Sequence, residues 1–252
     1  MNLEKQVKNS LKSFKLEYFG ISETGLVRSN NEDVWSVIPG KQFFILADGM
    51  GGHKAGEVAS SLAVESMCES IDSLPAKILV EEACQFLREA IAKANAKVFE
   101  KAHHHFDYAG MGTTLSCFVI LENFLIYGHI GDSRLYRYRD KLEQLTEDHS
   151  LRQILWDKKE KSSPPTLLFR NAITRAIGTQ PSVLPDIGVI ALHSNDLYML
   201  CSDGLSDYVD KDKTARILSS SDSLEKMGRN LVELALEKGG NDNITLLLVR
   251  IL

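Results

Sequence analysis

Short apolar runs separated by turn residues dominate the chain, and amphipathic stretches lie between groups of them. The runs are rich in Val, Ile, Leu and Phe and have the length of strands. They predict strands over residues 16–23, 34–38, 42–47, 113–121, 124–130, 135–138, 142–145, 187–191, 196–201 and 244–251. The link Glu122-Asn123 between two of these runs predicts a hairpin turn.

Helical spacing of apolar residues is clearest over residues 80–99, where Val80, Leu87, Ile91 and Val98 recur on one face. We expect further helices over 55–71, 148–157, 211–218 and 224–237, and Gly239-Gly240 should end the last one. The tract 158–166 is rich in Lys, Ser and Pro and predicts a surface loop. Hairpin-linked strands and paired helices, without regular βαβ alternation, indicate an α+β fold with antiparallel sheets.

The composition is that of a folded globular protein. The chain has 252 residues, of which 44% are hydrophobic and 25% charged, and its net charge is −5. This balance argues against a nucleic-acid partner, which usually requires a basic surface. No apolar run approaches the roughly 18 residues of a membrane span, and no apolar signal segment follows the N-terminal lysines. We therefore expect no membrane association, a cytoplasmic location and four reduced cysteines.

Four aspartates stand where predicted core strands begin or end. Asp48, Asp132 and Asp203 follow apolar runs and adjoin a glycine, and Asp242 precedes the last run. A single aspartate of this kind is usually a turn or capping residue. Four that come together would repel one another, and a divalent cation with oxygen ligands would relieve that repulsion. Because no cluster of His and Cys accompanies them, Mg²⁺ or Mn²⁺ is favoured over Zn²⁺.

An upstream segment, RSNNED at 28–33, adds Arg28 to these carboxylates. Alone, the segment would be a solvated turn. Beside a metal site, the guanidinium fork suits the oxygens of a phosphate group. The tract His103-His104-His105 is interpreted as a solvated helix end, and the absence of a GxxxxGK[ST] sequence excludes a P-loop.

Seven short motifs occur in a fixed order along nearly the whole chain. They are RSNNED (28–33), DGMGGHKAGE (48–57), GTT (112–114), GDSR (131–134), NAITRAIG (171–178), CSDGLSD (201–207) and GNDNIT (240–245). Through them the chain resembles the metal-dependent protein phosphatases of the 2C type, in their compact bacterial form. The resemblance implies a four-layer α-β-β-α sandwich, with two central antiparallel sheets flanked by helices. It also implies one catalytic domain over 16–252, after an N-terminal extension over 1–15, with a flap near 150–170.

The resemblance further implies a serine/threonine protein phosphatase that reverses Ser/Thr kinase signalling. Such an enzyme hydrolyses phosphoserine and phosphothreonine monoesters with a water or hydroxide that bridges two Mg²⁺ or Mn²⁺ ions, and bacterial members bind a third ion. By this resemblance Asp48 bridges both core ions, the Gly49 carbonyl binds one of them, and Asp203 and Asp242 bind the other. Asp132 and Asp203 bind the third ion. Glu32 and Asp33 contact metal-bound waters, and Arg28 binds the phosphate. We expect a monomer whose partners are phosphoproteins made by a Ser/Thr kinase.

The sequence departs from the family pattern at Met50. Animal members often carry a histidine there, proposed as a general acid, and methionine cannot donate a proton. The composition of the 150–170 segment is also unusual and leaves substrate choice open. Two other classes were considered. An inactive relative would require a lost ligand, and none of the implied ligands is missing; a haloacid-dehalogenase-like phosphotransferase would require DxDx[TV], which Asp48-Gly49-Met50 does not supply.

Overall fold

The computed structural model describes residues 15–51, 55–151, 153 and 172–252. Its strands are β1 (Leu16–Glu23), β2 (Asp33–Ile38), β3 (Phe43–Met50), β4 (Gly112–Thr113), β5 (Leu115–Leu121), β6 (Phe124–Ile130), β7 (Arg134–Tyr138), β8 (Leu142–Gln144), β9 (Asp186–Ala191), β10 (Leu197–Cys201) and β11 (Ile244–Ile251). Its helices are α1 (Ala55–Asp72), α2 (Val80–His104), α4 (Asp203–Ser206), α5 (Lys211–Leu218) and α6 (Leu224–Glu237), and short 3₁₀ turns cover Pro39–Lys41 and Phe106–Tyr108.

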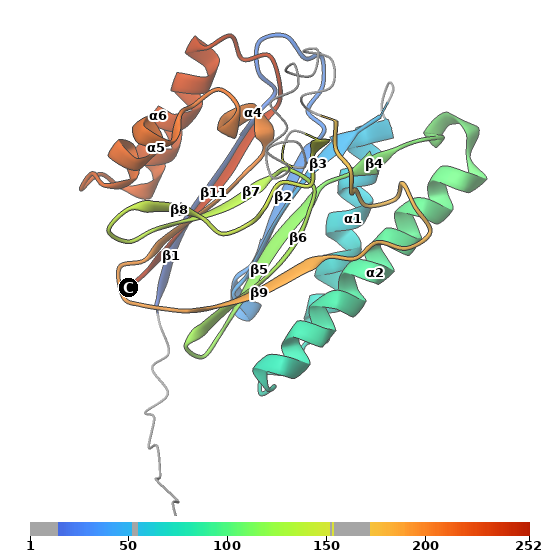
Figure 1. Ribbon diagram of the computed structural model, residues 1–252, viewed down its shortest axis with the longest axis horizontal. Helices are drawn as coiled ribbons and strands as arrows, with labels where there is room; N and C mark the ends of the chain where they lie inside the picture. The colour runs from blue at the N-terminus through green and yellow to red at the C-terminus, as the bar shows by residue number, and fades with distance from the viewer. Residues whose placement is uncertain (1–14, 52–54, 152, 154–171) are drawn as a thin grey trace, which may run out of the picture.

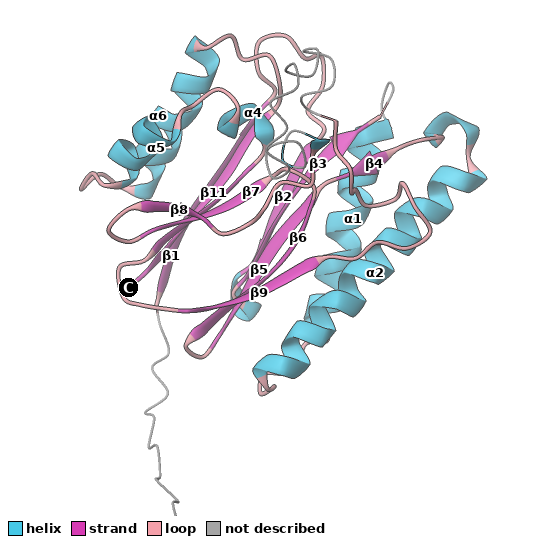
Figure 2. Cartoon of the chain, viewed as in Figure 1, coloured by secondary structure: helices cyan, strands magenta, loops and turns pink. Residues whose placement is uncertain are grey.

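Two antiparallel sheets lie face to face between two layers of helices (Figure 1). One sheet has the strand order β1-β11-β10-β7-β8 and is covered by α5 and α6. The other has the order β2-β3-β5-β6-β9, with β4 paired to β3, and is covered by α1 and α2. Figure 2 shows the same layers, with α1, α2, α5 and α6 on the outer faces of the two sheets. The expected four-layer sandwich is confirmed.

Strand β3 shows why its sequence is an unbroken apolar run rather than an alternating one. Phe43, Ile45 and Ala47 pack in the core beneath α1 and α2. Phe44 and Leu46 point to the opposite face and pack between the two sheets. Strand β11 is buried in the same way, between α6 and the second sheet. A strand that is covered on both faces has no solvent-facing position for polar residues.

Most of the expected elements are present, with some differences at their ends. The hairpin at Glu122-Asn123 forms, with Glu122 at a φ of 53°. The strand expected over 113–121 is divided at Thr114, which binds the backbone of Asp48 instead. Helix α2 extends to His104, and helix α4 was not expected.

The helix expected over 148–157 is wrong at its start. Asp148 and His149 have no helical backbone, and Ser150 forms a bridge with Ile173. The His149 amide donates to the Gly131 carbonyl at 2.8 Å, so tertiary hydrogen bonds replace the helical ones. The rest of that helix, nearly all of the 150–170 flap, the 158–166 loop and all but residue 15 of the 1–15 extension lie outside the described residues. Among the described residues, no helix is both long enough and apolar enough to cross a bilayer.

Candidate active site

Five carboxylates gather where strands from both sheets end. Asp33 begins β2 and lies opposite Asp48 in the register of β2 and β3. Asp132 lies between β6 and β7, Asp203 opens α4 directly after β10, and Asp242 precedes β11. The negative charges of the other four all act on the Asp48 carboxylate. Because these strands are neighbours in the two sheets, residues more than 200 positions apart meet at one edge of the sandwich.

Four of these carboxylates, those of Asp33, Asp48, Asp132 and Asp203, resist ionisation in the protein alone. Burial raises the pKa of Asp48 well above its ordinary value, and the charges of Asp33 and Asp203 raise it further. Burial, followed by the charges of Asp132 and Asp242, raises the pKa of Asp203 in the same way. Burial also raises the pKa of Asp33 and of Asp132 to about 6. The cluster lacks positive charge at its centre, which a cation would supply.

Two buried carboxylate oxygens have no hydrogen-bond partner among the described residues, Oδ1 of Asp33 and Oδ1 of Asp132. Buried polar atoms are nearly always paired, so these two are free to bind a cation or its water. Within the described ranges, no group of three or more His, Cys, Asp or Glu side chains already has the arrangement of a metal site. An open set of hard oxygen ligands completed by water is the arrangement that Mg²⁺ uses. The residues present therefore fit a hydrated divalent cation.

The backbone of Asp48 is held on both sides by a hydroxyl network. The Asp48 amide donates to Thr114 Oγ1 at 2.9 Å, and its carbonyl accepts from Thr113 Oγ1 at 2.8 Å and from the Thr114 amide at 2.9 Å. The hydroxyls of Thr114 and Ser133 are 2.7 Å apart. These contacts tie β3 to the turn that carries Asp132, and they fix the relative position of two candidate ligands.

Gly49 occupies a place where no side chain fits. A Cβ there would collide with the carbonyls of Gly56 and Glu32. The Gly49 amide donates to the Glu32 carbonyl at 3.1 Å, and Ser60 Oγ donates to the same carbonyl at 2.6 Å. Glu32 is thus buried at the entry of α1, next to the strand that carries Asp48. The glycine is required by this close approach of two backbones.

Arg28 lies at the exposed edge of the cluster. Its Nη2 donates to Asp242 Oδ2 at 2.8 Å, and about half of its side chain is exposed. Asn243 holds the two segments together, because its Nδ2 donates to the carbonyls of Thr24 and Asn30 and its Oδ1 accepts from the Glu32 amide. The guanidinium therefore stands beside the carboxylates with part of its surface open to a ligand.

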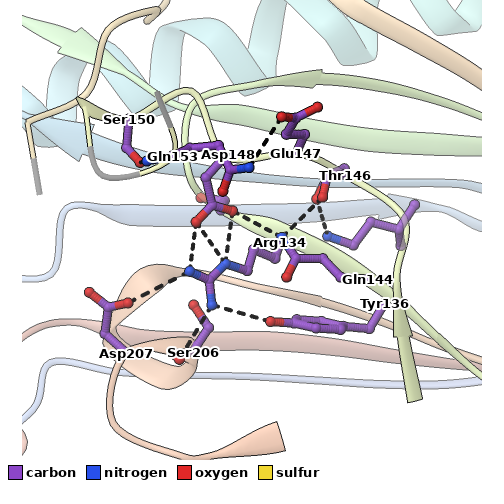
Figure 3. Close-up of polar contacts among 12 residues, drawn as sticks. Arg134, Tyr136, Gln144, Thr146, Glu147, Asp148, Ser150, Gln153, Ser206 and Asp207 are labelled. Atoms are coloured by element: carbon purple, nitrogen blue, oxygen red, sulfur yellow. Dashed lines mark hydrogen bonds and ion pairs between the residues drawn. The ribbon is translucent and has the colours of Figure 1, made fainter. Parts of the chain in front are cut away.

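A buried ion pair lies behind Asp132 and Asp203. Arg134 Nε donates to both oxygens of Asp148, at 2.8 and 3.1 Å, and Nη2 donates to Asp148 Oδ2 at 2.6 Å (Figure 3). Arg134 Nη1 donates to the Ser206 carbonyl at 3.4 Å, and Nη2 lies 3.8 Å from Asp207 Oδ1. Arg134 therefore connects the turn after Asp132 to the helix that Asp203 begins.

Two histidines brace the same turn from the other side. The Gly131 amide donates to His149 Nδ1 at 3.1 Å, so Nε2 carries the ring proton and donates to Asp186 at 3.0 Å. The rings of His129 and His149 are 4.8 Å apart. Burial, together with the charge of His149, lowers the pKa of His129 to about 4. Burial lowers the pKa of His149 as well, so both rings are neutral at pH 7 and support the site without adding charge.

All of the residues named from sequence lie at or beside this one edge: Arg28, Glu32, Asp33, Asp48, Gly49, Asp132, Asp203 and Asp242. Their roles as metal ligands or phosphate contacts stay predictions. Sequence reasoning assigned no role to the residues that hold them, above all Thr113, Thr114, Ser133, Arg134 and Asn243. All five lie inside the short motifs GTT, GDSR and GNDNIT, and that was the only signal available.

A buried carboxylate centre beside an arginine, at one edge of a two-sheet sandwich, supplies the oxygen ligands and the cation that a metal-dependent phosphate hydrolase needs. The sequence model of the protein phosphatase 2C family matches residues 27–244. The chain belongs to the protein phosphatase 2C family. This membership also excludes the haloacid-dehalogenase-like alternative.

Similar proteins of this family come from several bacteria. The chain is 36% identical over 234 residues to the serine/threonine phosphatase stp of Listeria monocytogenes, covering 90% of this chain and 93% of that protein. It is 40% identical over 236 residues to the serine/threonine protein phosphatase PstP of Mycobacterium tuberculosis, covering 91% of this chain and 44% of that longer protein.

Solved structures agree closely with the fold. The catalytic domain of PstP in complex with two manganese ions has a TM-score of 0.84 and 35% identity, covering 95% of this chain and all of that one. The Stp1 phosphatase of Staphylococcus aureus has a TM-score of 0.87 and 34% identity, covering 94% of this chain and 96% of that one.

Proposed function

We propose that the protein is a serine/threonine protein phosphatase that hydrolyses phosphoserine and phosphothreonine monoesters on proteins. The observation that carries this proposal is the buried carboxylate cluster with two unpartnered oxygens, at the edge of which Arg28 is half exposed. Membership of the family and the names of its relatives support the same activity.

Two Mg²⁺ or Mn²⁺ ions at the core and a third outside it would be held by this cluster. Asp48 is assigned to both core ions, with the Gly49 carbonyl on one and Asp203 and Asp242 on the other. Asp132 and Asp203 are assigned to the third ion, and Glu32 and Asp33 to waters around the core. When bound, the cations neutralise the carboxylates and acidify water near the phosphorus atom. The two manganese ions in the solved PstP domain support this assignment.

The chain's own residues position the reactants. Arg28 binds the phosphate oxygens through its exposed N–H groups and offsets the charge that grows on them during transfer. Thr113, Thr114 and Ser133 keep Asp48 fixed while this occurs. Water attacks phosphorus, the bond from phosphorus to the Ser or Thr oxygen breaks, and the alcohol leaves with a proton. Met50 has no proton to give, so that proton comes from water.

The same proposal includes the wider setting of the enzyme. Residues 16–252 form one catalytic domain after an extension over 1–15, with a flap near 150–170 that contacts substrates. The protein acts as a monomer in the cytoplasm, without a membrane partner, and reverses signalling by a Ser/Thr kinase. The absence of any helix in the described residues that could cross a bilayer is compatible with this setting.

The test is phosphate release from matched phosphopeptides after chelation and restoration of Mn²⁺ or Mg²⁺. We expect phosphothreonine and phosphoserine to be hydrolysed faster than phosphotyrosine, and only with metal present. Faster turnover of phosphotyrosine would refute the substrate class. A folded, metal-loaded protein with no activity on any phosphopeptide would instead favour the inactive relative.

A further inference from the structure

A cavity of about 450 Å³ lies beside the candidate active site and has no role in the mechanism above. Met50 forms one wall, and residues of the 173–184 segment form the others. Met50 and Asp48 are two positions apart on β3, so their side chains share one face of the strand and their backbones are about 7 Å apart. Figure 1 shows the 173–184 segment passing beside β4 before it enters β9. The cavity is therefore a direct neighbour of the carboxylate cluster.

The walls of the cavity are fixed, although the 173–184 segment has no regular helix or strand. Asn95, buried on α2, donates to the Gln180 carbonyl at 3.0 Å and accepts from the Gly178 amide at 2.8 Å. Ile177 and Thr113 exchange two backbone hydrogen bonds. Such a preformed wall loses little conformational entropy when a ligand binds, which favours affinity.

The lining combines apolar and polar side chains, and the part closest to the active site is apolar. Thr179 Oγ1 donates to the Ala176 carbonyl at 3.1 Å, which occupies the hydroxyl. The Thr179 methyl and the Met50 methyl converge over Gly112, since a Cβ there would lie 2.8 and 2.9 Å from them. Leu184, at the rim, has 70% of its surface exposed. Ile173, Ala176 and Val183 are the other apolar residues of the lining, so Leu184 adds to an apolar side of the cavity.

The charges at the cavity are balanced. Arg175 Nη1 donates to Asp186 Oδ1 at 3.0 Å and to the Leu184 carbonyl at 3.3 Å. Asp186, which stands next to the cavity, therefore balances Arg175, the charged side chain of the described lining. A charged ligand group would lose its water there without gaining an opposite charge, whereas an apolar group would gain from burial.

We propose that this cavity binds an uncharged apolar side chain, such as Leu or Met, of the phosphoprotein substrate. That side chain belongs to a residue two or three positions from the phosphorylated one, because an extended peptide advances about 3.3 Å per residue and Met50, which lines the cavity, is about 7 Å along β3 from Asp48. The proposal rests on the proposed phosphatase activity and adds a determinant of substrate sequence to it.

The test measures kcat/KM on phosphothreonine peptides in which each position from three before to three after the phosphoresidue is Ala, Leu, Lys or Glu. We expect Leu at one position, two or three residues away, to raise kcat/KM about tenfold over Ala. Lys and Glu should give no such gain. p-Nitrophenyl phosphate, which is too small to reach the cavity, serves as the reference substrate.

Two variants change the cavity without burying new groups in the core. Leu184→Ala removes apolar surface at the rim, and Thr179→Trp fills the space from an exposed position. Both variants should abolish the preference for Leu. Both should leave turnover of p-nitrophenyl phosphate within about twofold of wild type, because that substrate does not contact the cavity and gains no binding energy from it. Leu79→Ala, which changes an equally exposed leucine at the start of α2, is the matched control and should keep the preference.

The outcomes separate this proposal from the activity on which it rests. Wild-type protein that hydrolyses phosphopeptides without any preference for Leu, or variants that both keep the preference, would overturn the cavity proposal alone. A folded, metal-loaded wild type that hydrolyses no phosphopeptide would overturn the proposed function and this inference with it.

Discussion

The substitution Arg134→Met tests the buried ion pair behind the candidate active site. The side chains of Arg134 and Asp148 are 10% and 6% exposed, and three N–H···O contacts of 2.6 to 3.1 Å join them. Methionine fills much of the same space but takes the charge and the three short N–H contacts of Arg134 away from the buried Asp148 carboxylate. Breaking one side of a buried pair costs about 3–5 kcal/mol, so the free energy of unfolding should fall by that amount.

The measurement is urea unfolding followed by circular dichroism at pH 7, with an exposed ion pair as control. Arg229 and Glu225 on α6 are 61% and 59% exposed and 3.0 Å apart. Arg229→Met should cost less than about 1 kcal/mol, because solvent screens an exposed pair. Equal losses for Arg134→Met and Arg229→Met would refute the reasoning. Replacing both partners, with Arg134→Met and Asp148→Leu together, should recover part of the loss, since the buried carboxylate is then removed together with the guanidinium.

The same substitution should also weaken the site. Arg134 joins the turn after Asp132 to the Ser206 carbonyl, at the end of the helix that Asp203 begins. Without it, the two aspartates assigned to the outer metal lose a common support. At a temperature where the variant is folded, we expect less Mn²⁺ retained per chain than in wild type. Unchanged metal content would show that the pair stabilises the fold without positioning the aspartates.

Three further predictions concern single residues. Asp48→Ala should lower activity by several orders of magnitude, without rescue by added Mn²⁺, and Asp132→Ala should lower turnover and total bound metal. EDTA should abolish the activity of the wild type, and Mn²⁺ or Mg²⁺ should restore it. Full activity after chelation, or a folded Asp48→Ala variant that is active, would contradict the metal assignment. Arg28→Ala should lower kcat/KM about ten- to hundredfold, the loss of a charge-assisted hydrogen bond of roughly 1.5–3 kcal/mol, and a loss as small as that of Arg229→Ala would exclude a phosphate contact. His129 has a pKa of about 4 when folded and about 6.5 when unfolded, so the unfolded chain binds more protons between those values and stability should fall by roughly 3 kcal/mol as pH drops through that window. Urea midpoints at pH 7 and 4.5 should differ less in His129→Gln than in wild type, and equal differences would contradict this.

The sequence alone determined the features that depend on local pattern. The apolar runs at 43–47 and 244–251 identify strands buried on both faces, because the periodicity of side chains along a strand is a local property. The turn residues Glu122-Asn123 predicted the hairpin, because turn preference is also a property of a few neighbouring residues. The aspartates at the ends of these runs could be identified as candidate ligands, because a carboxylate that is buried beside a strand costs free energy unless a positive charge compensates it.

Only the tertiary structure decided how the site is supported. Asn243 binds carbonyls at Thr24 and Asn30 across more than 200 positions, and Arg134 finds Asp148 fourteen positions away. At 148–150 the helix-compatible sequence has no helical backbone, because a hydrogen bond to Gly131 and a bridge to Ile173 outweigh local preference. Such contacts have no sequence period: they form when the order of strands brings distant segments together, and that order is set by the packing of the two sheets.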